Sequence, residues 1–113
     1  MSMSLSSDVP IAIQAFVDTT NAGDADAFVA VFTEDAFLSD WGKEFEGREG
    51  VAAWDRSDNI GRRSHFDLLA VKPGLGDQQF VATVMVTGDG FNGTSDLEFT
   101  LRGDRVARLV ITP

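Results

Sequence analysis

Largely apolar side chains recur with helical spacing at the start of the chain. Between residues 9 and 20 they form one stripe, made up of Val9, Ile13, Phe16, Val17 and Thr20. This spacing is typical of one face of an α-helix. Asp8 is suited to cap the helix and Gly23 to end it, since glycine readily takes the left-handed conformation of a C-cap. We therefore predict a first helix between Asp8 and Gly23.

Two further helices are predicted before the middle of the chain. Asp24 can cap a short second helix, whose apolar face would consist of Phe28, Val31 and Phe32. The third helix is expected over about residues 48–60, where Val51 and Trp54 share one side and Gly61 acts as a stop.

The remaining segments have strand patterns. Residues 36–41 (AFLSDW) predict a short strand, and Gly42 begins a turn into residues 43–46. Longer strands are expected after the third helix, separated by Gly-rich or Pro-Gly breaks, over residues 64–72, 79–87, 94–102 and 104–112. Helices that precede a run of hairpin-linked strands indicate the α+β class.

The length of 113 residues corresponds to one domain. We expect a flexible, serine-rich N-terminus over residues 1–7 and a single domain over residues 8–113. A long, strongly curved sheet covered by three helices would enclose a conical space, which is a natural site for a small ligand.

Composition narrows the range of partners. The formal net charge of −9 opposes binding to nucleic acid and to anionic membranes. The chain has no cysteine and one histidine, so we expect no metal site and no disulfide. It shows no signal-peptide pattern and no membrane-spanning run, and we predict a cytoplasmic protein without a cofactor.

Three segments resemble the nuclear transport factor 2-like superfamily, and within it the branch of SnoaL-like and ketosteroid isomerase-like proteins. They are the NAGD between the first two helices, the FTEDA before the first strand and the EGREG at the third helix. The resemblance implies three N-terminal helices on a strongly curved mixed or antiparallel sheet that forms a conical pocket. Since this fold has many functions, it identifies the architecture better than the activity.

Asp40 is the leading candidate for a catalytic residue. On a strand it would share a side with Ala36 and Leu38, while Phe37 and Trp41 would face the other side. The resemblance implies that Asp40 points into the pocket at the position of the isomerases' catalytic base, where removal from water makes a carboxylate a stronger base. The alternative is a strand-end residue that caps the following turn.

The other catalytic groups of the isomerases are not matched. The position of their oxyanion-hole tyrosine is Phe16, and the protonated aspartate falls on Leu97 or, with a shift of one residue, on Asp96. Loss of one such donor typically costs about 100- to 1000-fold in rate, so a true steroid isomerase is not expected.

His65 is the second catalytic candidate, since it resembles one of the histidines of the dehydratase branch and could pair with Asp67. The alternative is a structural histidine at a strand start. The resemblance implies that Phe16, Trp41 and Trp54 belong to the ligand-binding wall. Further candidates for this wall are Met85, Leu97 and Phe99.

Two functions remain open. One is binding of a small, largely apolar molecule with cofactor-free proton transfer by Asp40, as in an isomerase, dehydratase or cyclase. The other is a non-catalytic ligand-binding or assembly module of the same fold. The apolar residues of the last three strands also predict a homodimer through the open face of the sheet.

Overall fold

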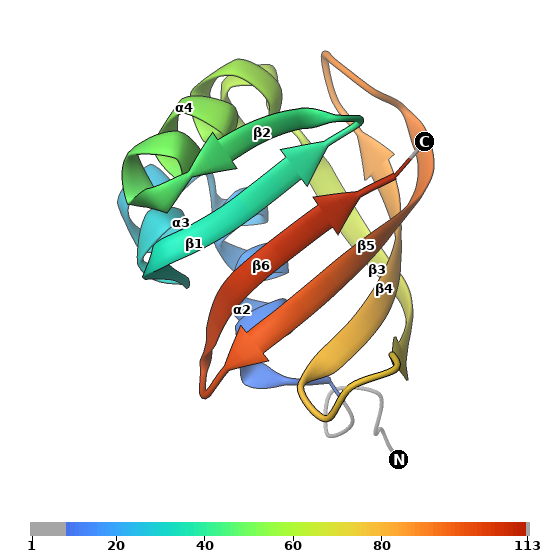
Figure 1. The fold of residues 1–113 in the computed structure, drawn as a ribbon. Helices are drawn as coiled ribbons and strands as arrows, with labels where there is room; N and C mark the ends of the chain where they lie inside the picture. Colours follow the sequence, from blue (N-terminus) through green and yellow to red (C-terminus); the bar gives the residue numbers. More distant parts are fainter. Residues whose placement is uncertain (1–8, 113) are drawn as a thin grey trace.

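Six strands form one mixed sheet in the order β2-β1-β6-β5-β4-β3 (Figure 1). The computed structural model describes residues 9–112. The strands are β1 (Phe32–Asp40), β2 (Lys43–Glu46), β3 (His65–Pro73), β4 (Gln79–Thr87), β5 (Gly93–Arg102) and β6 (Arg105–Ile111). Neighbouring strands are antiparallel except β1 and β6, which are parallel.

The helices cover one face of this sheet, which confirms the predicted α+β class (Figure 1). They are α2 (Ile11–Ala22), α3 (Ala25–Ala30) and α4 (Gly47–Asp58), followed by the short 3-10 helix η1 (Ile60–Arg62). None of the helices within residues 9–112 is long and apolar enough to cross a membrane.

The boundary between the first two helices is as the sequence predicts. Gly23 ends α2 in the left-handed conformation, with φ 68°. The carboxylate of Asp24 accepts a hydrogen bond of 3.1 Å from the amide of Ala27 and so caps α3. The predicted cap at Asp8 and the predicted N-terminal segment over residues 1–7 lie outside the described residues.

The predicted start of the first strand is wrong by four residues. Helix α3 ends at Ala30, and β1 begins at Phe32 instead of residue 36. The cause is pairing with the far end of the chain, since Phe32 lies opposite Val106 of β6 and the amide of Val106 donates to the carbonyl of Val31 at 2.9 Å. Residues 43–46, predicted as part of a turn, form β2 against β1.

Aromatic rings form the centre of the core between the helices and the sheet. The ring of Phe16 from α2 lies 5.4 Å from that of Phe28, 5.4 Å from that of Phe66 and 5.2 Å from that of Phe99, measured between centroids. Phe32 joins the same cluster. These rings fill the space beneath the middle of the sheet, so a cavity there can form only beside the cluster.

The sheet is curled but not closed. Register irregularities in β1, β3 and β5 interrupt the ladders, at Phe32/Phe37, Leu68/Ala70 and Thr100/Leu101. Such irregularities bend a strand and increase its local twist. The curl leaves a hollow between α4, the end of β1 and the inner face of β4 and β5.

Candidate functional site

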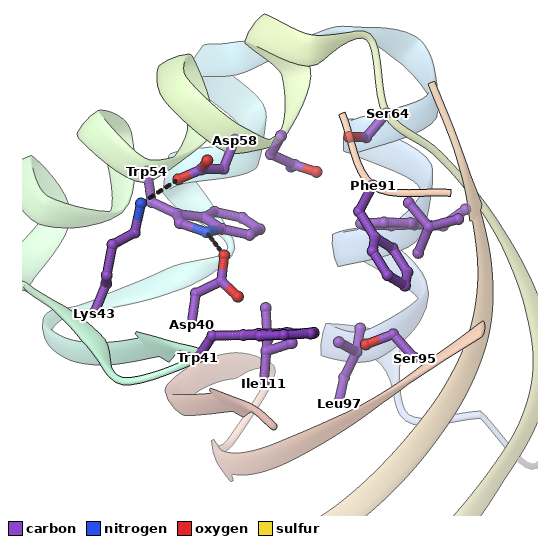
Figure 2. A pocket seen from close by; sticks show the side chains of 13 residues that line it. Asp40, Trp41, Lys43, Trp54, Asp58, Ser64, Phe91, Ser95, Leu97 and Ile111 are labelled. Atoms are coloured by element: carbon purple, nitrogen blue, oxygen red, sulfur yellow. Dashed lines mark hydrogen bonds and ion pairs between the residues drawn. The ribbon is translucent and has the colours of Figure 1, made fainter. Parts of the chain in front are cut away.

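A pocket of about 400 Å³ lies in this hollow (Figure 2). Its wall is mainly apolar, with contributions from Trp41, Trp54, Phe66, Val86, Phe91, Leu97 and Ile111. Its polar lining consists of Asp40, Lys43, Asp58, Asn59, Ser64 and Ser95. A volume of about 300–1000 Å³ and an apolar wall with a few polar groups are typical of small-molecule sites.

Asp40 is fixed in the pocket wall by a tryptophan. It is the last residue of β1, on the same side as the buried Ala36 and Leu38. The indole Nε1 of Trp54, on α4, donates a hydrogen bond of 2.9 Å to Asp40 Oδ2 (Figure 2). Within residues 9–112 the other oxygen, Asp40 Oδ1, accepts no side-chain or loop hydrogen bond. One carboxylate oxygen is therefore held, and the second is free to meet a ligand.

The orientation of Trp54 is fixed in turn by the core. Its side chain is buried, and its ring stacks with that of Phe28 at a centroid distance of 6.1 Å. Because packing leaves the indole little freedom, the hydrogen bond sets the position of the carboxylate.

Trp41 lies at the pocket through an unusual turn. Asp40 pairs with Lys43, so Trp41 and Gly42 form a two-residue hairpin loop. Their φ angles are 51° and 88°, as the type I′ turn requires. Strict alternation predicted Trp41 on the face opposite Asp40, and this is wrong because the left-handed turn brings the indole over the cavity (Figure 2).

An ion pair lies at the edge of the pocket beside Trp54. Lys43 Nζ on β2 is 3.7 Å from Asp58 Oδ2 on α4. Both side chains are partly exposed, so water screens the pair and it contributes little to stability.

A buried polar network supports the end of α4. The side-chain nitrogen Nδ2 of Asn59 donates to Thr20 Oγ1 at 3.0 Å and to Asp55 Oδ1 at 3.1 Å. The backbone amide of Ile60 also donates to Asp55 Oδ1, at 3.3 Å. Burial is the main effect on Asp55 and raises the pKa of its carboxyl. The network ties α2 to the turn after α4.

His65 does not lie in the pocket. It is exposed on the outer face of the sheet, where its Nε2 lies 3.3 Å from Asp67 Oδ1. Alternation along β3 places Phe66 inside, with 6% of its surface exposed, and its neighbours outside. The expected pairing of His65 with Asp67 is present, but neither side chain lines the cavity, although Ser64 and Phe66 on either side of His65 do.

The predicted wall residues are divided between three environments. Trp41, Trp54 and Leu97 line the pocket together with Asp40. Phe16 and Phe99 are fully buried in the core cluster, so they support the site without reaching it. Met85 lies on the outer face, opposite Asp67 of β3. The pocket thus assembles four of the eight predicted residues, counted as Asp40, Trp41, Trp54 and Leu97.

The two serines of the lining were not identified from sequence. Strand alternation could have identified Ser95, because it lies two residues before the predicted wall residue Leu97 and therefore on the same side of β5. Ser64 lies just before β3, so the alternation of sides along a strand does not predict where its side chain points. Among residues 9–112, no cluster of three or more His, Cys, Asp or Glu side chains is placed to hold a metal ion.

Comparison with solved structures supports the same fold. A Sinorhizobium meliloti protein provisionally assigned as a polyketide cyclase superposes with a TM-score of 0.83 at 24% identity, over 95% of this chain and 98% of that one. A Kribbella flavida protein provisionally assigned as a ketosteroid isomerase has a TM-score of 0.74 at 14% identity, over 91% and 75% of the two chains. A Mycobacterium tuberculosis protein in complex with estradiol-17β-hemisuccinate has a TM-score of 0.74 at 14% identity, over 89% of each chain.

These solved structures share the fold of this chain, with three helices on a curled mixed sheet. The model of the SnoaL-like domain matches residues 13–109, which is most of the chain. The chain therefore belongs to the SnoaL-like domain family. No curated protein matches its sequence.

Proposed function

We propose that this protein binds a small, largely apolar, oxygen-bearing molecule in the pocket and that Asp40 transfers a proton of that molecule. The proposal is based on the hydrogen bonding of the Asp40 carboxylate. One oxygen is held by Trp54 Nε1 at 2.9 Å, and the other is free at the wall of an apolar cavity. A general base must be positioned in this way before its basicity matters.

The chemistry requires only the carboxylate and a carbonyl-activated C–H bond. Asp40 Oδ1 takes a proton from the carbon beside the carbonyl, and the C–H electron pair forms the double bond of an enolate. The negative charge then lies on the carbonyl oxygen. The protonated Asp40 returns the proton to the same or a conjugated carbon, which regenerates the ketone or gives its isomer.

Size and polarity support a ligand of this class. The cavity of about 400 Å³ is large enough for a molecule of a few fused rings. The structurally similar Mycobacterium tuberculosis protein binds a steroid ester, which is an apolar ring system with oxygen groups at its ends.

The test is exchange of the α-protons of 2-tetralone with D₂O, followed by proton NMR. The wild type should accelerate the exchange, and Asp40→Asn should lower the protein-catalysed rate by about 100-fold or more, the usual contribution of a general base. Asp96→Asn is the matched control, because Asp96 binds Thr83 on the outer face of the sheet. Equal rates for wild type and Asp40→Asn would rule out the proton-transfer role.

A second function, binding without turnover, is favoured by the apolar nature of two positions. The resemblance puts the tyrosine donor at Phe16 and the protonated aspartate at Leu97 or, with a shift of one residue, at Asp96. Phe16 and Leu97 cannot donate a hydrogen bond, and Asp96 lies on the outer face, where it accepts from Thr83. In this case 2-tetralone would bind in the pocket and its exchange rate would equal that in buffer.

The homodimer through the outer face of the sheet also belongs to this proposal. That face carries Val81 and Val110, but Glu98 lies between them and pairs with both, so its apolar area is interrupted. Measurement of the molecular mass in solution at micromolar concentration tests the homodimer, and the mass of a monomer would contradict it. The cytoplasmic location stays a prediction.

A further inference from the structure

Asn59 brings an unsatisfied polar atom to the wall of the pocket. It directly follows α4 and lines the same cavity as Asp40. Only 1% of its surface is exposed, so it belongs to the buried part of the wall. Its oxygen Oδ1 is the one buried side-chain nitrogen or oxygen within residues 9–112 that has no hydrogen-bond partner. An acceptor of this kind is costly to a fold, so a partner for it is expected.

Every other polar atom of Asn59 is already hydrogen-bonded. Its backbone amide donates to the carbonyl of Asp55 at 3.2 Å, and its carbonyl accepts from the amides of Arg62 at 2.9 Å and Ser64 at 3.1 Å. Its Nδ2 uses both hydrogens, on Thr20 Oγ1 and on Asp55 Oδ1. Oδ1 is therefore the single atom of this residue that is left without a partner.

The side-chain amide of Asn59 cannot turn over to satisfy Oδ1. Asp55 Oδ1 also accepts from the backbone amide of Ile60 at 3.3 Å, and a backbone amide can only donate. Asp55 Oδ1 is thus an acceptor and must face the nitrogen of Asn59. Exchange of the two ends of the amide would bring two acceptor oxygens together. The network therefore fixes Oδ1 in place, and its partner must come from another molecule.

The other two asparagines of the chain have satisfied oxygens. Asn21 Oδ1 accepts from the backbone amide of Phe66 at 2.8 Å, and Asn92 Oδ1 accepts from that of Gly88 at 3.2 Å. Neither asparagine lines the cavity. The free oxygen thus occurs at the asparagine that belongs to the pocket.

The part of the wall at Asn59 is separate from the carboxylate of Asp40. The carbonyl of Asn59 is bonded to the amide of Ser64, and Figure 2 shows Ser64 across the open space from Asp40. Because Oδ1 is buried, its donor has to come from a molecule that enters the cavity. The charged neighbour Asp58 is already paired with Lys43, so a neutral donor suits this part of the wall.

We propose that Asn59 Oδ1 accepts a hydrogen bond from a hydroxyl group of the ligand. This inference rests on the proposed function and deepens it, because it selects hydroxylated ketones among the apolar, oxygen-bearing molecules. The carbonyl oxygen of an amide can only accept, so a ketone, ether or carboxylate oxygen of the ligand cannot take this place. The ketone group is then left for the part of the cavity at Asp40.

The test compares 2-tetralone with the four hydroxy-2-tetralones that carry one hydroxyl on the aromatic ring. Dissociation constants for the wild type are measured by titration of the backbone amide resonances. At least one of the four isomers should bind about 5- to 10-fold more tightly than 2-tetralone, as expected for one added hydrogen bond. The methyl ether of that isomer keeps the oxygen but lacks the donor, so it should lose the gain.

The side-chain carbon Cγ of Asn59 reports the contact without a substitution. This matters because Asn59→Ala would also remove the hydrogen bonds to Thr20 and Asp55. In protein that contains carbon-13-labelled asparagine, the Cγ resonance of Asn59 should move downfield with the tight-binding isomer and not with 2-tetralone. Asn21 and Asn92 are internal controls, since their Oδ1 atoms already have backbone donors.

Tighter binding together with a shift confined to the Cγ of Asn59 supports the inference. It is overturned if no isomer binds more tightly than 2-tetralone, or if the gain comes without a shift at Asn59, which leaves a buried water molecule as the partner of Oδ1. Proton exchange of 2-tetralone that still depends on Asp40 keeps the proposed function standing in that case. Failure of the wild type to bind any of these ketones overturns the inference and the proposed function together.

Discussion

Trp54 Nε1 and Asp40 Oδ2 lie 2.9 Å apart and join α4 to the end of β1 at the wall of the pocket. This contact links stability to the site. A tryptophan that is needed for packing also holds the carboxylate in place. Its removal should therefore affect both the fold and the proton transfer.

Trp54→Phe should lower the free energy of unfolding by about 1–3 kcal/mol, because it deletes a hydrogen bond to a carboxylate and part of a buried ring. Trp41→Phe is the matched control. Trp41 is 60% exposed and donates no hydrogen bond through its indole among the described residues, so its loss should cost within about 0.5 kcal/mol. Urea denaturation measures both. Equal losses would show that the Trp54–Asp40 contact adds nothing.

Gly88→Ala should destabilise the protein by about 2 kcal/mol or more and also weaken binding of 2-tetralone. Its φ of 152° strains any other residue, and the added Cβ would press on the carbonyl of Arg63 and on Ser64. Gly103→Ala is the control, since Gly103 has φ 62° but no atom near its Cβ position. It should cost only about 1 kcal/mol, from backbone strain alone. A larger loss at Gly103 than at Gly88 would contradict the close contact.

Asp55→Asn should change how stability depends on pH. Burial raises the pKa of Asp55 in the folded state, so folding favours the protonated carboxyl. The resulting stabilisation is fully present below the unfolded pKa, about 3.8, and is lost as the pH rises through the folded pKa. The variant should therefore gain stability relative to the wild type across that interval. Thermal unfolding at a series of pH values measures the difference.

Asp35→Asn is the control, because the pKa of Asp35 is lowered in the folded state whereas that of Asp55 is raised. The hydroxyl of Thr33 and the guanidinium of Arg102 lower the pKa of Asp35. Its contribution is present above the unfolded pKa and is lost as the pH falls through the folded pKa. The variant should thus lose stability relative to the wild type as the pH rises over that interval. Parallel pH profiles for the two variants would contradict the assignment for Asp55.

Local features of the fold were predictable from the sequence. The C-cap at Gly23 and the N-cap at Asp24 depend on residues within one turn, so composition alone identifies them. Every boundary of β3 to β6 agrees with the prediction to within one residue, because turn residues separate the strands. The family resemblance implied that Asp40 points into a pocket, and Asp40 lines the cavity of about 400 Å³.

Features that depend on distant partners were not predictable. The start of β1 is set by pairing with β6, about seventy residues further along the chain. Alternation places His65 and Phe66 on opposite faces of β3 but does not say which face is inside. Strand alternation did not place Trp41 beside Asp40, and only the resemblance implied a wall position for it, because Trp41 reaches the pocket through a left-handed turn that a bulky residue rarely adopts. Each of these outcomes depends on tertiary packing.

The indole N–H resonances test the central claim most directly, since the chain has two tryptophans and Trp41→Phe assigns their signals. On addition of 2-tetralone, the Trp54 resonance should shift, because the ligand enters beside the carboxylate that its N–H binds. In Asp40→Asn the free resonance should already be moved upfield, since the charged acceptor is gone. An unmoved Trp54 resonance, with amide shifts confined to the outer face of the sheet, would contradict the account.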